Sequence, residues 1–282
     1  EINMGKDQPY NKLFFEFYKC LYEKEKYRYL ITGDVDDIKN IDIDDIKLVY
    51  DTFYHPKNMF LIVTGNVNPY EIEKIVNDNL AKKSFIKYME PKTLKVKEPK
   101  HVYKKEEVIK ANVEVEKAKV GLKISKKDIK NIDDVKLNIL LNLILNNNFG
   151  DTSDLKEELL QNGLITYMST NRYVMDDYII IDVTIESKYL DEAIKRVVNK
   201  LNDLQMNESD LKRKLHSSIA TMVVSYENCE EVNNMIQNYL IYYGKIIPDL
   251  KSIYENIKLS DVLQVINYIN TKEMTIVKMQ KN

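Results

Sequence analysis

The feature that most constrains this fold is a helix-and-strand pattern that occurs twice, at a fixed distance along the chain. The first copy is residues 38–65, IKNIDIDDIKLVYDTFYHPKNMFLIVTG, and the second spans residues 253–279. Asp45 matches Asp261, which gives a spacing of 216 residues (261 − 45). The same spacing relates five apolar pairs: Ile41 and Ile257, Ile43 and Leu259, Ile46 and Val262, Val49 and Val265, and Phe53 and Ile269. Such units are common enough to recur by chance, but a spacing held over so many positions favours duplication of a whole domain.

Each copy predicts a helix followed by a strand. In the first copy, Asp44 and Asp45 stand where an N-cap and a first-turn acid belong. Apolar residues then recur with helical spacing at Ile46, Val49, Tyr50 and Phe53. Pro56 ends this helix, because proline disfavours the α conformation of the residue before it. The apolar run 59–63 predicts a buried strand, and the two copies are expected to superpose.

The repeat also predicts how the chain is divided into domains. If the second copy closes a complete domain, the first copy needs a comparable length of chain before it, and too few residues precede it. We therefore expect residues 1–84 to be the C-terminal part of a first domain and residues 109–282 to be a second, homologous domain. The chain would then be the tail, or one piece, of a longer protein.

Residues 85–108 are expected to form the linker between these domains. The stretch contains two prolines and many lysines and breaks the helical periodicity. Its lysines are interleaved with Tyr88, His101 and Tyr103, which leaves a site for an anionic ligand as the alternative.

The second domain has the pattern of an α+β fold. Apolar alternation and apolar runs predict strands over residues 109–115, 118–124, 164–172 and 178–185. We expect the first two to pair with each other. Helices are predicted over residues 134–145, 154–161, 190–204, 208–226 and 230–243, and in the first domain over residues 9–25 and 69–83. The order of elements predicts two homologous domains, each a mostly antiparallel sheet with helices packed on one face, the first domain being incomplete.

Composition excludes several classes of protein. The chain of 282 residues is 44% apolar and 30% charged, as in water-soluble globular proteins, and its net charge of −2 gives no basic field for nucleic acid or an anionic membrane. No apolar run approaches the length needed to span a bilayer. Cys20 and Cys229 are too few for a disulfide framework and are expected to be free thiols in a reducing, cytoplasmic compartment.

No complete catalytic motif occurs in the sequence. The three histidines, His55, His101 and His216, have no partner at the spacing of a metal site. The acidic run 34–45 resembles a calcium loop but lacks the glycine and the closing glutamate of one, so solvated helix caps are expected there. Serine and cysteine side chains have no base nearby in the sequence. We therefore predict no catalytic residue within this chain.

Three segments resemble a known family of zinc peptidases. Residues 53–66, FYHPKNMFLIVTGN, resemble the FY-x-P-x-NM…L-x-V-x-G signature of the pitrilysin/insulinase family, the inverzincins, in particular its processing-peptidase-like bacterial members. Residues 1–9 resemble its E-I-x-M-x-x-D-x-P segment, and residues 149–165 resemble the S-x-L…L…GLI start of its second domain. The resemblance covers essentially the whole chain in order, and the family has two homologous domains per half-enzyme.

The resemblance implies a zinc site to which this chain contributes one residue. In the family, two histidines of an HxxEH helix and a glutamate far downstream bind zinc, and the HxxEH glutamate activates water. This sequence contains no HxxEH, which would lie before residue 1, and the downstream ligand corresponds to Glu1. Two imidazoles, a carboxylate and an open water position form a catalytic zinc site. Without the resemblance, Glu1 would be an ordinary exposed terminal acid, and by itself it cannot hold zinc.

A second comparison with the family concerns the arginine and tyrosine that grip substrate in its non-catalytic half. Thr166 stands where the tyrosine is expected, with Tyr167 one position away, and Glu158 or Leu159 replaces the arginine. The chain therefore resembles the remainder of a metal-bearing half that works against a separate partner half.

These observations predict the C-terminal portion of a cytoplasmic zinc metalloendopeptidase, inactive as this chain alone. Its expected partners are a peptide or small protein substrate and either a second half-enzyme subunit, as in a dimer, or the missing N-terminal segment, with no nucleic acid or membrane involved. One alternative is a non-catalytic scaffold or partner subunit of the same family. The other is a metal-free protein-interaction module.

Overall fold

The computed structural model describes residues 2–269 and 273–282, which form two compact units. Unit 1 contains the described residues of the stretches 1–32, 96–220 and 248–282. Unit 2 contains residues 33–95 and 221–247. Each unit thus combines stretches from both sides of segment 85–108, while the domain boundaries expected from the sequence stay a prediction.

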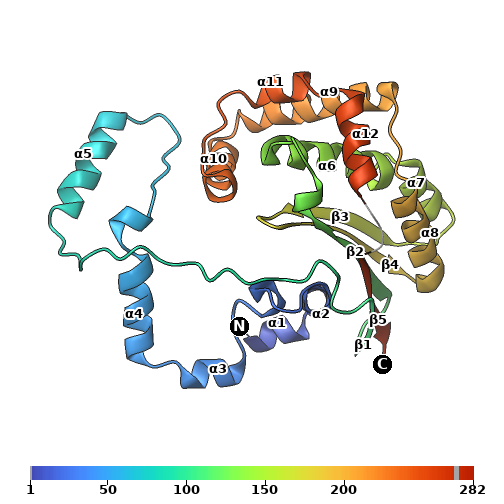
Figure 1. The fold of residues 1–282 in the computed structure, drawn as a ribbon, viewed down its shortest axis with the longest axis horizontal. Helices are drawn as coiled ribbons and strands as arrows, with labels where there is room; N and C mark the ends of the chain where they lie inside the picture. Colours follow the sequence, from blue (N-terminus) through green and yellow to red (C-terminus); the bar gives the residue numbers. More distant parts are fainter. Residues whose placement is uncertain (1, 270–272) are drawn as a thin grey trace. The chain divides into compact units, whose positions relative to one another are not determined.

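Unit 1 is built around one five-stranded sheet (Figure 1). Its strands are β1 (Glu106–Ala111), β2 (Glu116–Ser125), β3 (Tyr167–Val174), β4 (Tyr178–Ser187) and β5 (Met274–Lys281). Its helices are α1 (Ile2–Asp7), α2 (Pro9–Leu21), α6 (Asp134–Phe149), α7 (Asp154–Gln161), α8 (Leu190–Asn202), α11 (Leu250–Glu255) and α12 (Leu259–Tyr268). The α+β class is confirmed, with element bounds close to those predicted.

The strand order is β1-β5-β2-β4-β3, and every neighbouring pair except β1 and β5 is antiparallel. The mostly antiparallel sheet is therefore confirmed. The expected pairing of the first two strands is wrong, because the C-terminal strand lies between them: Met279 is opposite Ile109 on one side and Lys117 on the other. The two strands are neighbours in the sequence, but β1 pairs in parallel with β5, which comes from the C-terminal end of the chain.

Both faces of this sheet are covered. On one face the alternating residues of β2 are apolar and buried, and α6 and α8 contact strands β2, β3 and β4. Helix α2 packs on the other face against β1, β2 and β5. The predicted one-sided layer of helices is thus joined by a second layer, a single helix from the beginning of the chain.

Helix α2 packs on the sheet through a stripe of buried apolar side chains. Pro9 starts the helix, where a missing N–H costs nothing, and Leu13, Phe17 and Leu21 form its buried stripe. Phe17 lies over Gly121 of β2 so closely that a Cβ on this glycine would be 2.2 Å from the ring. Gly121 therefore provides the hollow that lets the helix approach the sheet.

Unit 2 contains helices without a sheet. Its helices are α3 (Val35–Asn40), α4 (Ile43–Phe53), α5 (Pro69–Leu80) and α10 (Cys229–Tyr243), and α9 (Glu208–Ser225) has residues in both units. Asp34 and Asp42 are N-caps with complete capping boxes, which confirms the acidic run as helix caps. Asp42, rather than Asp44 or Asp45, caps α4, and Asp45 closes its capping box.

The strand predicted over residues 59–63 is not formed, and this prediction is wrong for the chain as described. A strand needs a neighbouring strand to pair its backbone groups, and no described residue of unit 2 is in a strand. The segment instead contacts α10: Asn233 donates to the carbonyl of Ile62 over 3.3 Å, and the Thr64 hydroxyl donates to the carbonyl of Cys229 over 2.8 Å.

The internal repeat is visible in the helices. Helices α4 and α12 begin 216 residues apart (259 − 43), and Asp45 and Asp261 each accept a hydrogen bond from the N-cap backbone of their helix. The environments differ: Val265 is 0% exposed, whereas its counterpart Val49 is 52% exposed. The repeat therefore holds for the helix and its cap, while only the second copy has a following strand and a packed core.

Candidate functional site

The predicted metal ligand, Glu1, lies outside the described residues. Within residues 2–269 and 273–282, no group of three histidine, cysteine, aspartate or glutamate side chains could hold a metal ion. The described part of the chain therefore supplies no complete metal site of its own.

Each of the three histidines lies in ordinary surroundings. His55 caps a short 3-10 helix, accepts a hydrogen bond from the backbone N–H of Lys57 over 3.2 Å and contacts the ring of Tyr88. His101 is exposed, with Nε2 3.9 Å from a carboxylate oxygen of Glu23. His216 is exposed on α9. Among the described residues, none of the three belongs to a group of side chains that could hold a metal ion.

The positions that correspond to the substrate-gripping pair also have structural roles. Glu158 forms an ion pair with Arg196, and Leu159 is fully buried. Thr166 is exposed, and Tyr167 packs edge-on against Tyr10 of α2. These four positions therefore supply no arginine–tyrosine pair.

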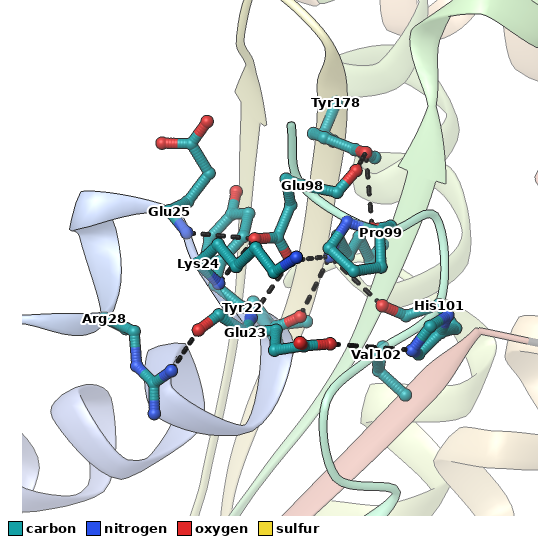
Figure 2. Close-up of polar contacts among 12 residues, drawn as sticks. Tyr22, Glu23, Lys24, Glu25, Arg28, Glu98, Pro99, His101, Val102 and Tyr178 are labelled. Carbon is teal, nitrogen blue, oxygen red and sulfur yellow. Dashed lines mark hydrogen bonds and ion pairs between the residues drawn. The ribbon is translucent and has the colours of Figure 1, made fainter. Parts of the chain in front are cut away.

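A buried ion pair between Glu98 and Lys123 forms the centre of a polar cluster in unit 1. The Lys123 ammonium lies 2.6 Å from a Glu98 oxygen, and their side chains are 0% and 1% exposed. The Glu98 carboxylate also accepts backbone N–H groups that follow α2, from Glu23, Lys24 and Glu25, over 2.7–3.0 Å (Figure 2). Four donors thus surround one carboxylate, which is how a buried charge is tolerated.

The ammonium of Lys123 is equally well satisfied. Besides Glu98, it donates to the carbonyls of Leu21 and His101, each over 3.1 Å, so all three donors are used. The rings of Tyr22 and Tyr178 lie 5.0 and 4.8 Å from it, within cation–π distance. The Tyr178 hydroxyl donates to the carbonyl of Glu98 over 2.7 Å (Figure 2).

These contacts determine the charge of the pair. Burial alone would raise the pKa of Glu98, but the Lys123 ammonium and the backbone N–H groups together outweigh it and lower that pKa below its ordinary value. Burial lowers the pKa of Lys123, and the Glu98 carboxylate offsets this in part. The carboxylate is held charged and fully occupied, so it serves as an anchor for backbone and offers no free acid or base.

Two further ion pairs follow along the same face of β2. Lys117 pairs with Glu186, which also accepts a hydrogen bond from the Tyr10 hydroxyl. Lys119 pairs with Asp182, whose second oxygen has no hydrogen-bond partner among the described residues. With Lys123 these form a row of buried lysines beneath α2.

The sequence pattern does not predict this row of buried lysines. Lysines at positions 117, 119 and 123 alternate with apolar residues, a pattern that normally marks the solvent side of a strand. Two sequence features accompany the row: Gly121 lies within it, and α2 carries a stripe of aromatic residues. Neither feature indicates that the other packs against it.

The comparisons with known proteins place this fold in a family. The family model described as the peptidase M16 inactive domain matches residues 40–217, well over half of the chain. The chain belongs to the M16 peptidase family. This confirms the resemblance to the pitrilysin/insulinase zinc peptidases drawn from the sequence.

Two relatives named as zinc proteases match almost the whole chain. It is 32% identical to the uncharacterized zinc protease YmfH of Bacillus subtilis over 99% of its own length and 66% of that protein, so it spans just under two thirds of this relative. Zinc protease PqqE of Helicobacter pylori is 25% identical, with 96% of this chain and 62% of that protein covered.

Solved peptidase and protease structures share the fold. An M16-like peptidase from Alicyclobacillus acidocaldarius superposes with a TM-score of 0.89 at 20% identity, over 100% of this chain and 68% of the other. A protease from Helicobacter pylori gives a TM-score of 0.82 at 22% identity, over 98% and 68%. At these identities the likeness supports the fold alone.

Proposed function

We propose that this chain is the C-terminal portion of an M16 zinc metalloendopeptidase that hydrolyses peptides or small proteins. The observation that carries the proposal is the match of residues 40–217 to the M16 inactive domain, joined to 32% identity with a protein named a zinc protease. Those relatives extend beyond the part that this chain matches.

The proposed zinc site would be completed outside the described residues. These residues contain no metal-ligand group, so they do not fit zinc by themselves. By the family resemblance, the histidines and the base of an HxxEH helix would come from another segment, and Glu1 would be the third ligand. When bound in such a site, zinc lowers the pKa of its water and supplies the nucleophile.

We further propose that residues 1–84 are the C-terminal part of a first M16 domain, joined by linker 85–108 to a second domain, 109–282. The exposure of the apolar face of α4 supports this, since the equivalent face of α12 is buried. The proposed partners are the missing N-terminal segment, which would cover that face, and a second half-enzyme in a dimer. We propose a cytoplasmic location from the cysteine usage alone, and we propose no nucleic-acid or membrane partner because the net charge of −2 gives no basic field. Within the described residues, no helix has the length and apolar character needed to cross a bilayer.

The test uses the natural protein and the present chain side by side. Intact mass, zinc content and cleavage of a quenched peptide library would be measured for both. We expect about one zinc and chelator-sensitive cleavage for a natural protein that carries HxxEH, and neither for this 282-residue chain. Chelator-sensitive cleavage by the chain alone would contradict the proposal that the zinc site is completed by a segment outside this chain.

Two other functions remain as outcomes of the same test. A natural protein that binds no zinc and lacks HxxEH would favour a non-catalytic scaffold or partner subunit of the family. A metal-free interaction module would be favoured if, in addition, no half-enzyme associates with it. The zinc protease names of both relatives favour the first proposal over these.

A further inference from the structure

The chain leaves unit 1 after Thr32 and returns to it at Val96, so residues 33–95 form an excursion into unit 2. Just before and just after this excursion, two segments of unit 1 lie side by side. We name residues 20–28 the exit segment and residues 98–104 the return segment. The backbone N–H of Lys104 donates to the carbonyl of Cys20 over 2.9 Å, which aligns them at one end.

Contacts at the surface between the two segments are weak. The Arg28 guanidinium lies 5.2 Å from the ring centre of Tyr103, and the Glu23 carboxylate is 3.9 Å from Nε2 of His101. Exposed pairs of this kind contribute little, because solvent screens them. They do not by themselves explain why the segments stay together.

The buried Glu98–Lys123 pair connects both segments to the sheet. Glu98 belongs to the return segment, and its carboxylate binds three consecutive backbone N–H groups of the exit segment (Figure 2). Lys123 belongs to β2 and donates to the exit segment at Leu21 and to the return segment at Glu98 and His101. Every donor of the ammonium thus reaches one of the two segments.

We propose that Glu98 and Lys123 form a clamp that ties the exit and the return of the 33–95 excursion to one point of the sheet. Released from the clamp, the exit chain is next held at Tyr22, whose N–H donates to Tyr18. The return chain keeps the hydrogen bonds of the Tyr178 hydroxyl to its Glu98 and Pro99 carbonyls, and its next backbone contact is at Val102, whose N–H donates to Glu273. Residues 23–25 then lose their only described acceptor, the Glu98 carboxylate, on the exit side, and residues 98–101 lose their contacts with Lys123 on the return side. The clamp therefore sets how tightly the excursion is tethered, and this does not depend on the proposed peptidase function.

The same strand provides a matched control. Lys119 is also buried and paired with an acid, but its partner Asp182 is on the adjacent strand β4, so this pair joins two strands and no departing segment. Replacing either lysine by methionine leaves one buried carboxylate without its cation. The two variants thus remove similar chemistry and differ in what the pair connects.

The experiment is hydrogen exchange of the full 282-residue chain with the substitutions Lys123→Met and Lys119→Met, together with trypsin cleavage at Lys24 and Lys97. For Lys123→Met we expect amides 23–25 to exchange about tenfold faster or more, because their charged acceptor is disturbed, and cleavage at both lysines to accelerate. For Lys119→Met we expect those rates to stay near the unsubstituted values, even if global stability falls.

Unchanged exchange at residues 23–25 in Lys123→Met would overturn the proposal. So would an equal acceleration in Lys119→Met, since that would be general destabilisation. If Lys123→Met does not fold, Glu98→Gln replaces it, because it keeps the size of the side chain and removes the charge that binds Lys123 and the backbone N–H groups of residues 23–25. A several-fold faster exchange confined to residues 23–25 and 98–102 supports the clamp, and wild-type rates there contradict it.

Discussion

The two cysteines differ in what surrounds their sulfur atoms. Cys20 is 1% exposed on the buried face of α2, and burial raises the pKa of its thiol to about 11, whereas Cys229 is exposed at the start of α10. Because the thiolate is the reactive form, we expect one thiol per folded chain to react quickly with a maleimide at pH 7.5 and both to react in denaturant. Peptide mapping identifies the labelled residue, and fast labelling of Cys20 in the folded chain would contradict this.

Glu98 gives the stability of unit 1 a specific dependence on pH. Its folded pKa is lower than its ordinary value of 4.5, so the unfolded chain binds more protons between the two values. The stability contributed by this carboxylate is therefore complete above pH 4.5 and is lost as the pH falls through the folded pKa. We expect Glu98→Gln to reduce stability at neutral pH and to flatten the dependence below pH 4.5.

The measurement is urea unfolding at a series of pH values, with Glu90→Gln as the control. Glu90 is exposed in the segment before the return to unit 1, so this control removes one charge without disturbing a buried pair. If both variants keep the same pH profile as the unsubstituted chain, Glu98 does not have the role assigned to it.

At the scale of elements, α2 and β2 meet through one small residue. Gly121→Ala would place a Cβ 2.2 Å from Phe17, a fully buried ring that cannot move without displacing the helix. We expect a loss of about 1–3 kcal/mol in the free energy of unfolding, as for other overpacked cores. Gly5→Ala in α1 is the control, because nothing lies within 4 Å of its Cβ. Recovery in Gly121→Ala/Phe17→Leu would confirm the clash as the cause, and an unaffected single variant would contradict it.

Elements whose signals are local could be predicted from the sequence. Asp133 and Ser153 cap α6 and α7 through their own side chains, so the caps and bounds of these helices follow from a few adjacent residues. The strand over residues 59–63 failed for the opposite reason, because a strand forms only when another chain segment pairs with it. The order of β1, β5 and β2 likewise depends on which distant strand fills the middle position.

The polar cluster could not be predicted from the sequence for the same reason, because it depends on segments that are distant in the chain. The alternation of Lys117, Lys119 and Lys123 with apolar residues predicts a solvent-facing side of β2, but α2 covers this side. No local pattern shows that a helix from the start of the chain lies there. Glu98 lies within the predicted linker 85–108, and the composition of that segment gives no sign that this side chain is buried. The family was predictable because residues 53–66 carry a specific sequence pattern, whereas Glu1 as a metal ligand stays a prediction.

For the whole molecule, the two copies of the repeat differ in what covers them. Helix α12 packs against α6, and its Val262 and Val265 are 0% exposed, while the matching Ile46 and Val49 of α4 are 56% and 52% exposed. Because α4 and α12 share their sequence pattern but differ in burial, we expect the apolar face of α4 to pack against another segment, as the face of α12 does. The expected cover is a segment equivalent to the sheet and α6 of unit 1.

This difference can be measured by making one substitution at both places. In the present chain we expect Val265→Ala to cost about 2 kcal/mol of unfolding free energy, from lost burial and a residual cavity, and Val49→Ala to change it by less than about 0.5 kcal/mol. In a natural protein that carries the proposed N-terminal segment, Val49→Ala should become nearly as costly as Val265→Ala, because the same packing would then surround both. If Val49→Ala stays neutral in a natural protein shown by mass to carry that segment, the two copies are not equivalent domains and the proposed completion of the first domain is wrong.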